Sequence, residues 1–426
     1  MSRSDLIVSI DIGSSKIVTL VGQYFAEEKK VNIIGVTNFP AQGIRKGQIV
    51  NIEQATESLI ESVEAAERMA GCSISNGFIG VSAPHINSMN SQGIVAIPDP
   101  NGEITAEDVK RVIESARAVS LPSSREILHV IPRQFTVDGQ KGVIDPIGMS
   151  GVRLEVEAHI VNASSPALKN LNKCIDEAGV KPLSFVFSGF ATAESVLTPT
   201  EKELGVILVD IGGGVTTLAI YNEGAPCYSA VLPIGAQNIT NDLAIGLRLS
   251  LDEAEKFKIR LADLKKNEEG EFETEEVSLK KLGVSNDEKK KISLKTAVNG
   301  IVSPRVNEIF SLIREEIKES GFGGTTPSGI VLTGGGAKTI GIKYNCQKVL
   351  GLPVRIGVPE KVGGIVDDVL SPEFASSLGL IFYGIKQKQQ QKNSGYKIIN
   401  FNKIGKKLPI KGAIQRLSEL LRPLLP

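Results

Sequence analysis

The stretch Asp11-Ile12-Gly13-Ser14-Ser15-Lys16 ends one apolar, β-branched run and precedes another. A stretch of the same design, Asp210-Ile211-Gly212-Gly213-Gly214-Val215-Thr216-Thr217, recurs 199 positions later. In both places an Asp-Ile-Gly turn connects two β-like segments, which predicts a β-hairpin and not a strand-to-helix crossover. The repetition indicates a duplicated core.

A third glycine run, Thr333-Gly334-Gly335-Gly336-Ala337, follows the apolar segment 330–332 and precedes a helical pattern. Glycine lets backbone N–H groups approach phosphate oxygens closely. We therefore expect the three loops to converge on one nucleotide. The candidate phosphate-binding residues are Gly13, Ser14, Ser15, Lys16, Gly212, Gly213, Gly214, Thr216, Thr217, Gly334, Gly335 and Gly336.

Each polar residue of these loops has an expected role. Lys16 adds a positive charge for the β- or γ-phosphate, and the hydroxyls of Thr216 and Thr217 add hydrogen-bond donors. Asp11 and Asp210 are expected to hold Mg²⁺ through water, because this ion keeps several waters and takes few direct carboxylates. Neither the Walker spacing nor the dinucleotide fingerprint is present.

Hairpin turns of this kind, in this order, resemble those of the actin-like ATPases. The resemblance implies an α/β protein with the actin-like, duplicated ribonuclease-H-like fold, which binds ATP with Mg²⁺. The chain is long enough for this, since 426 residues with 41% hydrophobic positions can bury the cores of two or more domains.

Composition excludes several other classes. No apolar run of about 18 residues is present and residues 1–5 lead straight into a strand pattern, so we expect neither a spanning helix nor a signal peptide, and a cytoplasmic location. The four cysteines and three histidines have no metal-ligand spacing, which argues against a structural zinc site and against disulfides. No nucleic-acid partner is expected.

An α+β insertion is predicted over residues 84–165, with a helix after Thr105 and strand patterns at 128–137 and 154–161. The string from Val137 to Leu154 closely resembles the FtsA family of bacterial cell-division proteins, whose extra subdomain is named 1C. Further matching motifs are Phe187-Ser188-Gly189, Leu232-Pro233-Ile234-Gly235 and Ser303-Pro304-Arg305. The match implies subdomain 1A at 1–83, 166–198 and 367–385, 1C at 84–165, 2A at 199–235 and 324–366, and 2B at 236–323.

The resemblance also implies site residues outside the glycine loops. Glu255 and Lys258, one helical turn apart, would contact the ribose or adenine; without the family, the same pair is an ordinary i,i+3 ion pair on a solvated face. Ser303 is expected to cap a helix that has Pro304 in its first turn and ends at Gly321. In the family this helix receives the C-terminal peptide of the tubulin-like protein FtsZ, and Arg305, with Glu308 one turn on, matches that site.

The C-terminal tail carries a strong positive charge. Residues 386–426 contain ten Lys or Arg against one acid, Glu419. Residues 386–409 lack apolar periodicity and predict a flexible linker. Residues 410–426 predict an amphipathic helix that binds anionic membrane lipid; a helix docked on the body of the protein is the alternative. The proposed membrane-facing residues are Ile414, Leu417, Leu420, Leu421 and Leu424.

The segment that connects the two halves bears on hydrolysis. In filament-forming relatives an acid there orients the attacking water, but Ser188 stands at that position and Glu194 is the only acid nearby. Glu194 is therefore the candidate catalytic base, with very slow hydrolysis expected because a positioned base contributes about 10² to 10⁴ in rate.

These features together predict a cell-division protein that polymerises on the cytoplasmic face of the inner membrane at the septum. It would anchor FtsZ filaments and help to recruit later division proteins, acting as a scaffold and at most as a slow ATPase. Two alternatives of the same fold stay open, namely a pilus-assembly scaffold like PilM and a small-molecule kinase.

Overall fold

Two β-hairpins of the same design each begin the core of one half of the structure, as the sequence predicts. In the first, β1 (Ser4–Ile12) and β2 (Lys16–Phe25) pair antiparallel, with Ile12 opposite Ile17 at the turn. In the second, β12 (Val206–Ile211) and β13 (Thr216–Asn222) pair in the same way, with Ile211 opposite Thr216. Both aspartates of the glycine loops therefore lie at strand ends.

The computed structural model describes residues 4–98, 102–264, 276–284, 291–360, 362–365 and 369–393. Residues 1–386 form one compact unit and residues 387–426 a second. The tail helix expected at 410–426 lies outside the described residues, as does most of the charge-rich segment 265–290. Among the described helices, none combines the length and the apolar character that crossing a bilayer requires.

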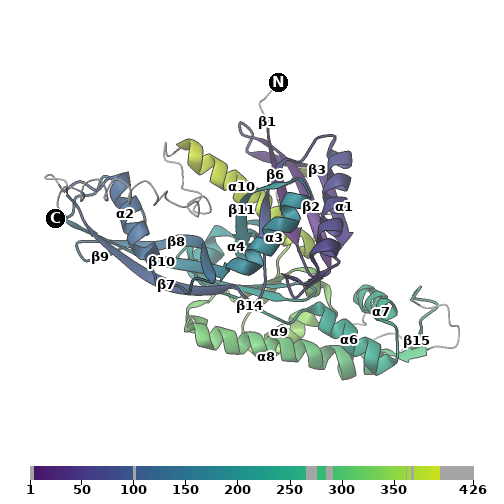
Figure 1. The fold of residues 1–426 in the computed structure, drawn as a ribbon. Coiled ribbons are helices and arrows are strands. Elements are labelled where there is room, and N and C mark those ends of the chain that lie inside the picture. Colours follow the sequence, from purple (N-terminus) through teal and green to yellow (C-terminus); the bar gives the residue numbers. More distant parts are fainter. Residues whose placement is uncertain are drawn as a thin grey trace, which may run out of the picture. The chain divides into compact units, whose positions relative to one another are not determined.

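The first hairpin belongs to a six-stranded sheet in the order β11-β6-β1-β2-β3-β19. The added strands are β3 (Lys30–Pro40), β6 (Asn76–Val81), β11 (Lys181–Phe187) and β19 (Gly363–Gly364). Side chains alternate across β1: Ile10 joins a core with α1 (Ile52–Ala70) and α3 (Ser165–Glu177), and Ile7 joins another with α10 (Ala375–Asn393). Helices thus cover both faces of this sheet (Figure 1).

The second hairpin belongs to a five-stranded sheet in the order β14-β13-β12-β17-β18. It adds β14 (Ala225–Leu232), β17 (Ile330–Thr333), which is parallel to β12, and β18 (Val354–Ile356). Its core includes α6 (Ala236–Leu247), α7 (Leu251–Asp263), α8 (Ser303–Ser320) and α9 (Ile342–Leu350), and Figure 1 shows α8 and α9 directly below β14. The hairpin followed by a parallel strand repeats the plan of the first sheet and confirms the predicted duplication.

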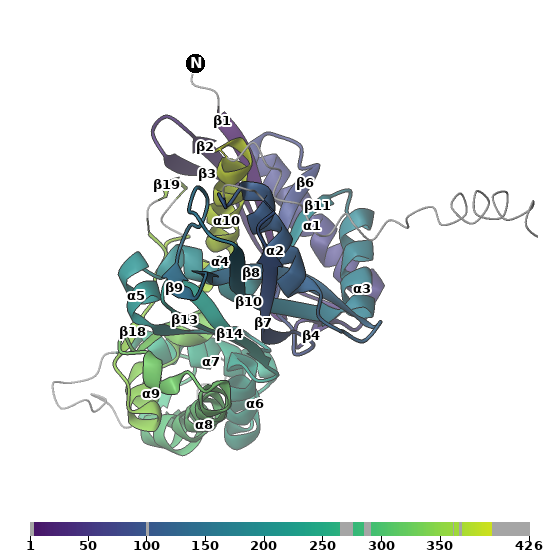
Figure 2. The same ribbon diagram turned by 90° about the vertical axis from the view of Figure 1, so that its left-hand side faces the viewer.

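The insertion is a separate four-stranded antiparallel sheet in the order β7-β10-β8-β9. Its strands are β7 (Asn87–Ala96), β8 (Arg125–Val137), β9 (Gln140–Val143) and β10 (Arg153–Ser164), and α2 (Ala106–Arg117) packs on it (Figure 2). A Cβ at Gly93 would lie 2.2 Å from the carbonyl oxygen of Val112, so glycine permits this close packing. An α+β insertion is confirmed; the exact subdomain limits stay a prediction.

Two expectations about helix ends are wrong. Ser303 does not cap α8: a π-helix, Thr296–Val302, runs directly into it, Val302 is already helical, and no side chain caps the junction. The end at Gly321 in the left-handed conformation is confirmed. The linker expected from Lys386 also begins too early, because α10 continues to Asn393. Buried Leu378, Ile381 and Ile385 anchor the first part of α10 in the core. The Lys and Gln residues that follow favour helix and extend it.

Candidate functional site

One cavity joins the three glycine loops, as the sequence predicts. It encloses about 700 Å³ of space, part of which is open to solvent. Predicted residues make up most of the lining: Asp11, Gly13, Ser14, Ser15, Lys16, Asp210, Gly212, Gly213, Gly214, Thr217, Gly334 and Gly335. The sequence did not predict a site role for the seven others, Ile12, Ser82, Ser188, Val215, Pro372, Glu373 and Ser376.

The first two loops have the same turn and contact each other. Gly13 N–H donates to the carbonyl oxygen of Lys16 at 3.0 Å, and Gly212 N–H donates to that of Val215 at 2.9 Å. A Cβ at Gly213 would lie 2.7 Å from Oγ of Ser15, and one at Gly214 would lie 2.6 Å from Oγ of Ser14. Glycine in the second loop is thus required by the serines of the first.

The third loop reaches the second aspartate. Gly334 has a φ of 83°, and a Cβ there would lie 2.2 Å from Oδ1 of Asp210. A Cβ at Gly336 would lie 2.4 Å from Cγ2 of Ile211, and Gly336 does not line the cavity. Gly335 differs from both, because the nearest atom to its Cβ is Cβ of Glu373 at 3.9 Å. Gly334 and Gly336 therefore serve packing within the protein, and Gly335 faces open space in the cavity.

Both aspartates line the cavity, and their carboxylates are close enough to repel each other. Burial raises the pKa of Asp11, and burial together with the charge of Asp11 raises the pKa of Asp210 to about 7. A hydrogen bond of 2.9 Å from Thr192 Oγ1 to Oδ2 of Asp210 acts in the opposite direction. A pair of buried carboxylates of this kind suits a cation that brings its own waters. Within the described residues no cluster of three His, Cys, Asp or Glu forms a closed metal site.

Polar side chains with spare donor capacity also line this cavity. Among the described residues, Oγ of Ser188 is buried without a hydrogen-bond partner. Nζ of Lys16 has only an ion pair of 3.5 Å with Oε2 of Glu373, and the hydroxyl of Ser376 interacts with Asp11. Buried polar groups normally have partners, because leaving one unpaired costs about 1 to 3 kcal/mol. An ammonium group and two hydroxyls beside two carboxylates match the chemistry of a phosphate group with a bound cation.

Thr216 and Thr217 were expected to share one role, but the structure places only Thr217 at the cavity. Oγ1 of Thr216 donates to the carbonyl oxygen of Ile234 at 2.8 Å, and its side chain is buried away from the cavity. Thr217 lines the cavity and exchanges a hydrogen bond of 2.5 Å with Ser82. Successive residues of a strand point to opposite faces, so only one of the two can serve a ligand there. The prediction that Thr216 donates to phosphate is wrong.

Glu194 does not face the cavity. Its carboxylate pairs with Nζ of Lys202 at 3.1 Å and with Nζ of Lys386 at 3.3 Å, and it is absent from the lining. Both Glu194 and Thr192 lie on α4 (Ser188–Val196), and two helical positions turn a side chain by about 200°. Because Thr192 contacts Asp210, Glu194 points the other way. This geometry argues against Glu194 as the catalytic base.

Glu255 and Lys258 form the ion pair that the sequence leaves as one alternative. Nζ of Lys258 lies 2.7 Å from Oε2 of Glu255 and also donates to Oγ1 of Thr240 at 2.8 Å. Neither residue lines the cavity, so a contact with the ribose or adenine stays an expectation. The pair is not on a fully solvated face, since the side chain of Lys258 is only 11% exposed. It ties α7 to α6, whose first residues donate backbone hydrogen bonds to the carbonyl oxygens of Gly212 and Gly213 in the second loop.

Arg305 and Glu308 lie on α8, away from the cavity. Arg305 contacts both carboxylate oxygens of Asp242 on α6, at 2.9 Å for the Nη2 to Oδ1 bond, and Nη1 lies 2.6 Å from Oε2 of Glu308. The interaction with Asp242 raises the pKa of Arg305. Asp242 was not foreseen, and no motif identifies it. Binding of a partner peptide at Arg305 and Glu308 stays a prediction.

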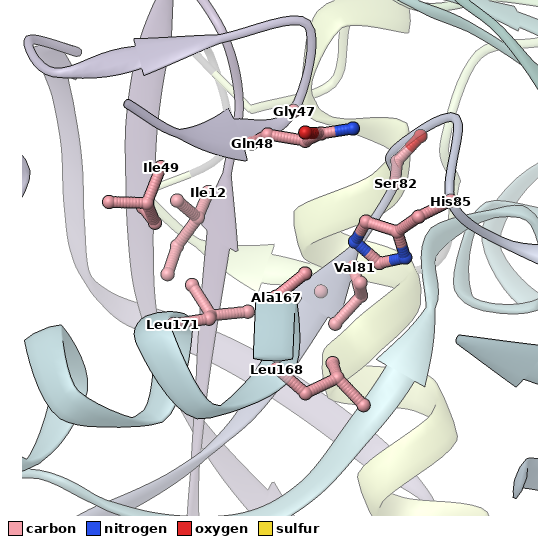
Figure 3. A pocket seen from close by; sticks show the side chains of 11 residues that line it. Ile12, Gly47, Gln48, Ile49, Val81, Ser82, His85, Ala167, Leu168 and Leu171 are labelled. Atoms are coloured by element: carbon pink, nitrogen blue, oxygen red, sulfur yellow. The ribbon is translucent and has the colours of Figure 1, made fainter. Parts of the chain in front are cut away.

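A second, smaller cavity of about 370 Å³ adjoins the first, with Ile12 and Ser82 in both linings. Figure 3 shows Leu168 and Leu171 of α3 on one side and Gln48, Ser82 and His85 on another. The hairpin β4 (Ile44–Arg45) and β5 (Gln48–Ile49) forms part of its wall, and Gly47 N–H donates to Oγ of Ser14 at 2.8 Å. This hairpin therefore supports the first phosphate loop.

Comparisons with known proteins agree with this geometry. A family model described as "SHS2 domain inserted in FTSA" matches residues 83–162, and one described as "Cell division protein FtsA" matches residues 207–379. Relatives named cell division protein FtsA include that of Pseudomonas aeruginosa, 41% identical over 90% of each chain. That of Borreliella burgdorferi is 38% identical over 96% of this chain and 98% of its own.

Solved structures show the same fold. A PilM–PilN type IV pilus biogenesis complex matches with a TM-score of 0.63 and 16% identity, over 89% of this chain and 98% of that one. MreB5 of Spiroplasma citri bound to ADP matches with a TM-score of 0.50 and 15% identity, over 92% of this chain and 98% of that one. At these identities the likeness extends to the fold, which is that of the actin-like ATPases.

Proposed function

The chain belongs to the FtsA family of cell-division proteins, and on that premise we propose that it is an ATP-binding scaffold of bacterial division. It polymerises on the cytoplasmic face of the inner membrane at the septum, anchors FtsZ filaments there and helps to recruit later division proteins. The relative from Pseudomonas aeruginosa, named cell division protein FtsA and 41% identical over 90% of the chain, supports this role.

The observation that carries nucleotide binding is the set of hydrogen-bond donors from three glycine loops that line one cavity around Asp11 and Asp210. Backbone N–H groups of the glycine loops, with Lys16, Ser14, Ser15 and Thr217, would hold the phosphates. Asp11 and Asp210 would orient the water shell of Mg²⁺, and the bound ion would neutralise phosphate charge. Related folds described as bound to ADP and to AMPPNP, at TM-scores of 0.50 and 0.51, support ATP as the ligand.

Slow hydrolysis follows from the residues of α4 at the cavity. Ser188 begins this helix and lines the cavity, but its hydroxyl is a poor base. Glu194 is turned away and held by two lysines. The chain therefore positions no free carboxylate of α4 over the phosphates, and nucleotide acts mainly as a structural ligand of the filament.

The partner surface is proposed on α8. Arg305 is held by Asp242 and Glu308, and the side chain of Glu308 is 54% exposed. A carboxylate of the FtsZ C-terminal peptide would exchange with Glu308 for Nη1 of Arg305. The tail, through Ile414, Leu417, Leu420, Leu421 and Leu424, would bind anionic lipid. No observation favours a pilus-assembly role or a small-molecule kinase.

Calorimetry with ATP and Mg²⁺ on Gly335→Asp tests the nucleotide site. Gly335 has room for a side chain, so the substitution leaves the fold intact but places a carboxylate beside phosphate. We expect affinity to fall at least about tenfold, which corresponds to about 1.4 kcal/mol. Gly324→Asp is the matched control, because Gly324 is also exposed, has no neighbour within 4 Å and is absent from the cavity lining. Unchanged affinity in Gly335→Asp would refute the assignment of the third loop.

A further inference from the structure

Glu373 is an acid in a cavity that would receive phosphate. It lies in the short 3-10 helix Pro372–Phe374, directly before α10, and lines the cavity. Its Oε1 lies 2.8 Å from Nζ of Lys338, and its Oε2 lies 3.5 Å from Nζ of Lys16. Ser371 Oγ donates to Oε1 of Glu373 at 3.2 Å. The contact of Glu373 with Lys16 is therefore the longest of its three polar contacts.

Without a bound cation, the charged side chains that line the cavity do not favour binding of phosphate. Among the described residues, three carboxylates, of Asp11, Asp210 and Glu373, line the cavity with a single ammonium group, that of Lys16. A divalent cation between the aspartates would balance two of these negative charges. Glu373 would then still cancel Lys16, the one side-chain charge there that attracts phosphate.

The electrostatic surroundings keep Glu373 charged. Burial alone would raise its pKa, but the hydrogen bond from Lys338 and the charge of Lys16 hold the pKa of Glu373 below its usual value. Its side chain is 29% exposed, so the carboxylate is shielded from water only in part. At neutral pH it is therefore an anion that contacts the same lysine as the expected ligand.

We propose that Glu373 competes with nucleotide phosphate for Lys16 and thereby limits the affinity of the site. The inference rests on the nucleotide site proposed above. When phosphate oxygens take Lys16, Glu373 keeps its contacts with Lys338 and Ser371, so it is not left as an unpaired charge. Because Lys338 stays paired with Glu373, the transfer of Lys16 from Glu373 to phosphate costs little free energy.

A different role would give the opposite result. If Glu373 instead held Lys16 in the orientation that phosphate requires, removing its charge would weaken binding. Nζ of Lys16 is 4.6 Å from the ring centre of Phe374 and is buried, so packing alone also restrains it. The sign of the change in affinity therefore separates competition from positioning.

The test is calorimetry of ATP and of ADP, each with Mg²⁺, on the full chain and on Glu373→Gln and Glu373→Ala. We expect both variants to bind nucleotide roughly tenfold more tightly, because each removes a negative charge from beside phosphate. The alanine variant excludes a new hydrogen bond from the glutamine amide. Glu194→Gln is the matched control, since Glu194 also bridges two lysines but lies outside the cavity lining, and its affinity should equal that of the unaltered protein.

Equal or weaker binding by both Glu373 variants, with normal binding by the unaltered protein, would overturn this proposal and leave the nucleotide site standing. No binding by any of the proteins, each shown to be folded by its thermal transition, would overturn the nucleotide site and this proposal together. Tighter binding in Glu194→Gln as well would show a general charge effect and would also contradict competition at Lys16.

Discussion

Thr192 Oγ1 donates a hydrogen bond of 2.9 Å to Oδ2 of Asp210. The donor lies on α4, which follows β11 at one edge of the first sheet, and the acceptor lies near the end of β12 in the second sheet. Asp210 has a pKa raised to about 7 by burial and by the charge of Asp11, so this bond stabilises a carboxylate that is costly to ionise. One half of the molecule thus supports the proposed cation site of the other.

Thr192→Val should weaken binding of ATP in the presence of Mg²⁺. Valine keeps the shape but removes the donor, and a hydrogen bond to a charged group contributes about 1.5 to 3 kcal/mol. A loss of about tenfold in affinity is expected by calorimetry. Thr192→Ser, which retains the hydroxyl, is the control and should bind normally. Normal binding by the valine variant would mean that Asp210 does not depend on this bond.

Glu194→Ala should lower stability and leave the rate of ATP hydrolysis unchanged. Glu194 bridges Lys202 and Lys386, and its side chain is 23% exposed, so its loss leaves two lysines without their shared partner. We expect a loss of about 1 to 2 kcal/mol in the free energy of unfolding, measured with urea. Glu64→Ala, at the exposed pair with Arg68, should cost under about 0.5 kcal/mol. Turnover near 1 s⁻¹ that disappears with Glu194→Ala would restore Glu194 as the base.

The parts of the site that the sequence predicts are those that local chemistry determines. A glycine run directly after a β-branched strand pattern is a local signal, and three such runs in order predict the cavity at Asp11, Asp210 and Gly335. The alternation of β13 also contained information that could have been used, because Thr216 and Thr217 cannot both face one ligand.

Other parts depend on contacts between distant segments, which no spacing encodes. Glu373 reaches Lys16 across more than 350 positions of the chain, and Thr192 reaches Asp210 from another sheet. Glu194 was proposed as the base because it is the only acid near Ser188 in the sequence. Its side chain points away from the cavity, because Thr192 on the same helix points toward Asp210. The start of α8 was mispredicted because Ser303 resembles a cap only if the preceding residues are not helical.

Stability should fall in mildly acidic solution because of two buried histidines. Burial lowers the pKa of His129 to about 4 and that of His159 to about 3. Nε2 of His129 accepts a hydrogen bond of 2.9 Å from Phe187 N–H, and His159 contacts Asn90 and Ser229 through its two ring nitrogens. Both folded-state values lie below the unfolded value of about 6.5, so the unfolded chain takes up protons first as the pH falls.

The two histidines should therefore lower the free energy of unfolding between about pH 6.5 and 4, by up to about 1.4 kcal/mol per pH unit each. Asp210 contributes in the opposite direction over this range, because its folded-state pKa of about 7 lies above its unfolded value. Urea titrations at several pH values measure the slope. His129→Gln removes one group that titrates and should make the slope shallower over this range. An unchanged slope in that variant would show that His129 is protonated in the folded protein.

Leu417→Glu should release the protein from vesicles of anionic lipid. The change places a charge in the apolar arc of the predicted tail helix, while each basic residue near an anionic surface contributes only roughly 1 kcal/mol before screening. Flotation with vesicles measures the bound fraction. Ser418→Glu adds the same charge to the polar side and should reduce binding less. Equal retention of Leu417→Glu and the unaltered protein would favour a helix docked on the body.

The most direct test of the account is sedimentation with anionic vesicles, with and without ATP and Mg²⁺, of the full chain and of a chain ending at Asn393. This truncation keeps α10 whole. We predict that ATP increases the fraction of full-length protein that sediments with lipid, because polymerisation adds avidity to a weak single tail. The truncated chain should stay in the supernatant with vesicles at concentrations where the full chain binds. Lipid binding that is independent of both nucleotide and residues 394–426 would contradict a nucleotide-dependent polymer held on the membrane by its tail.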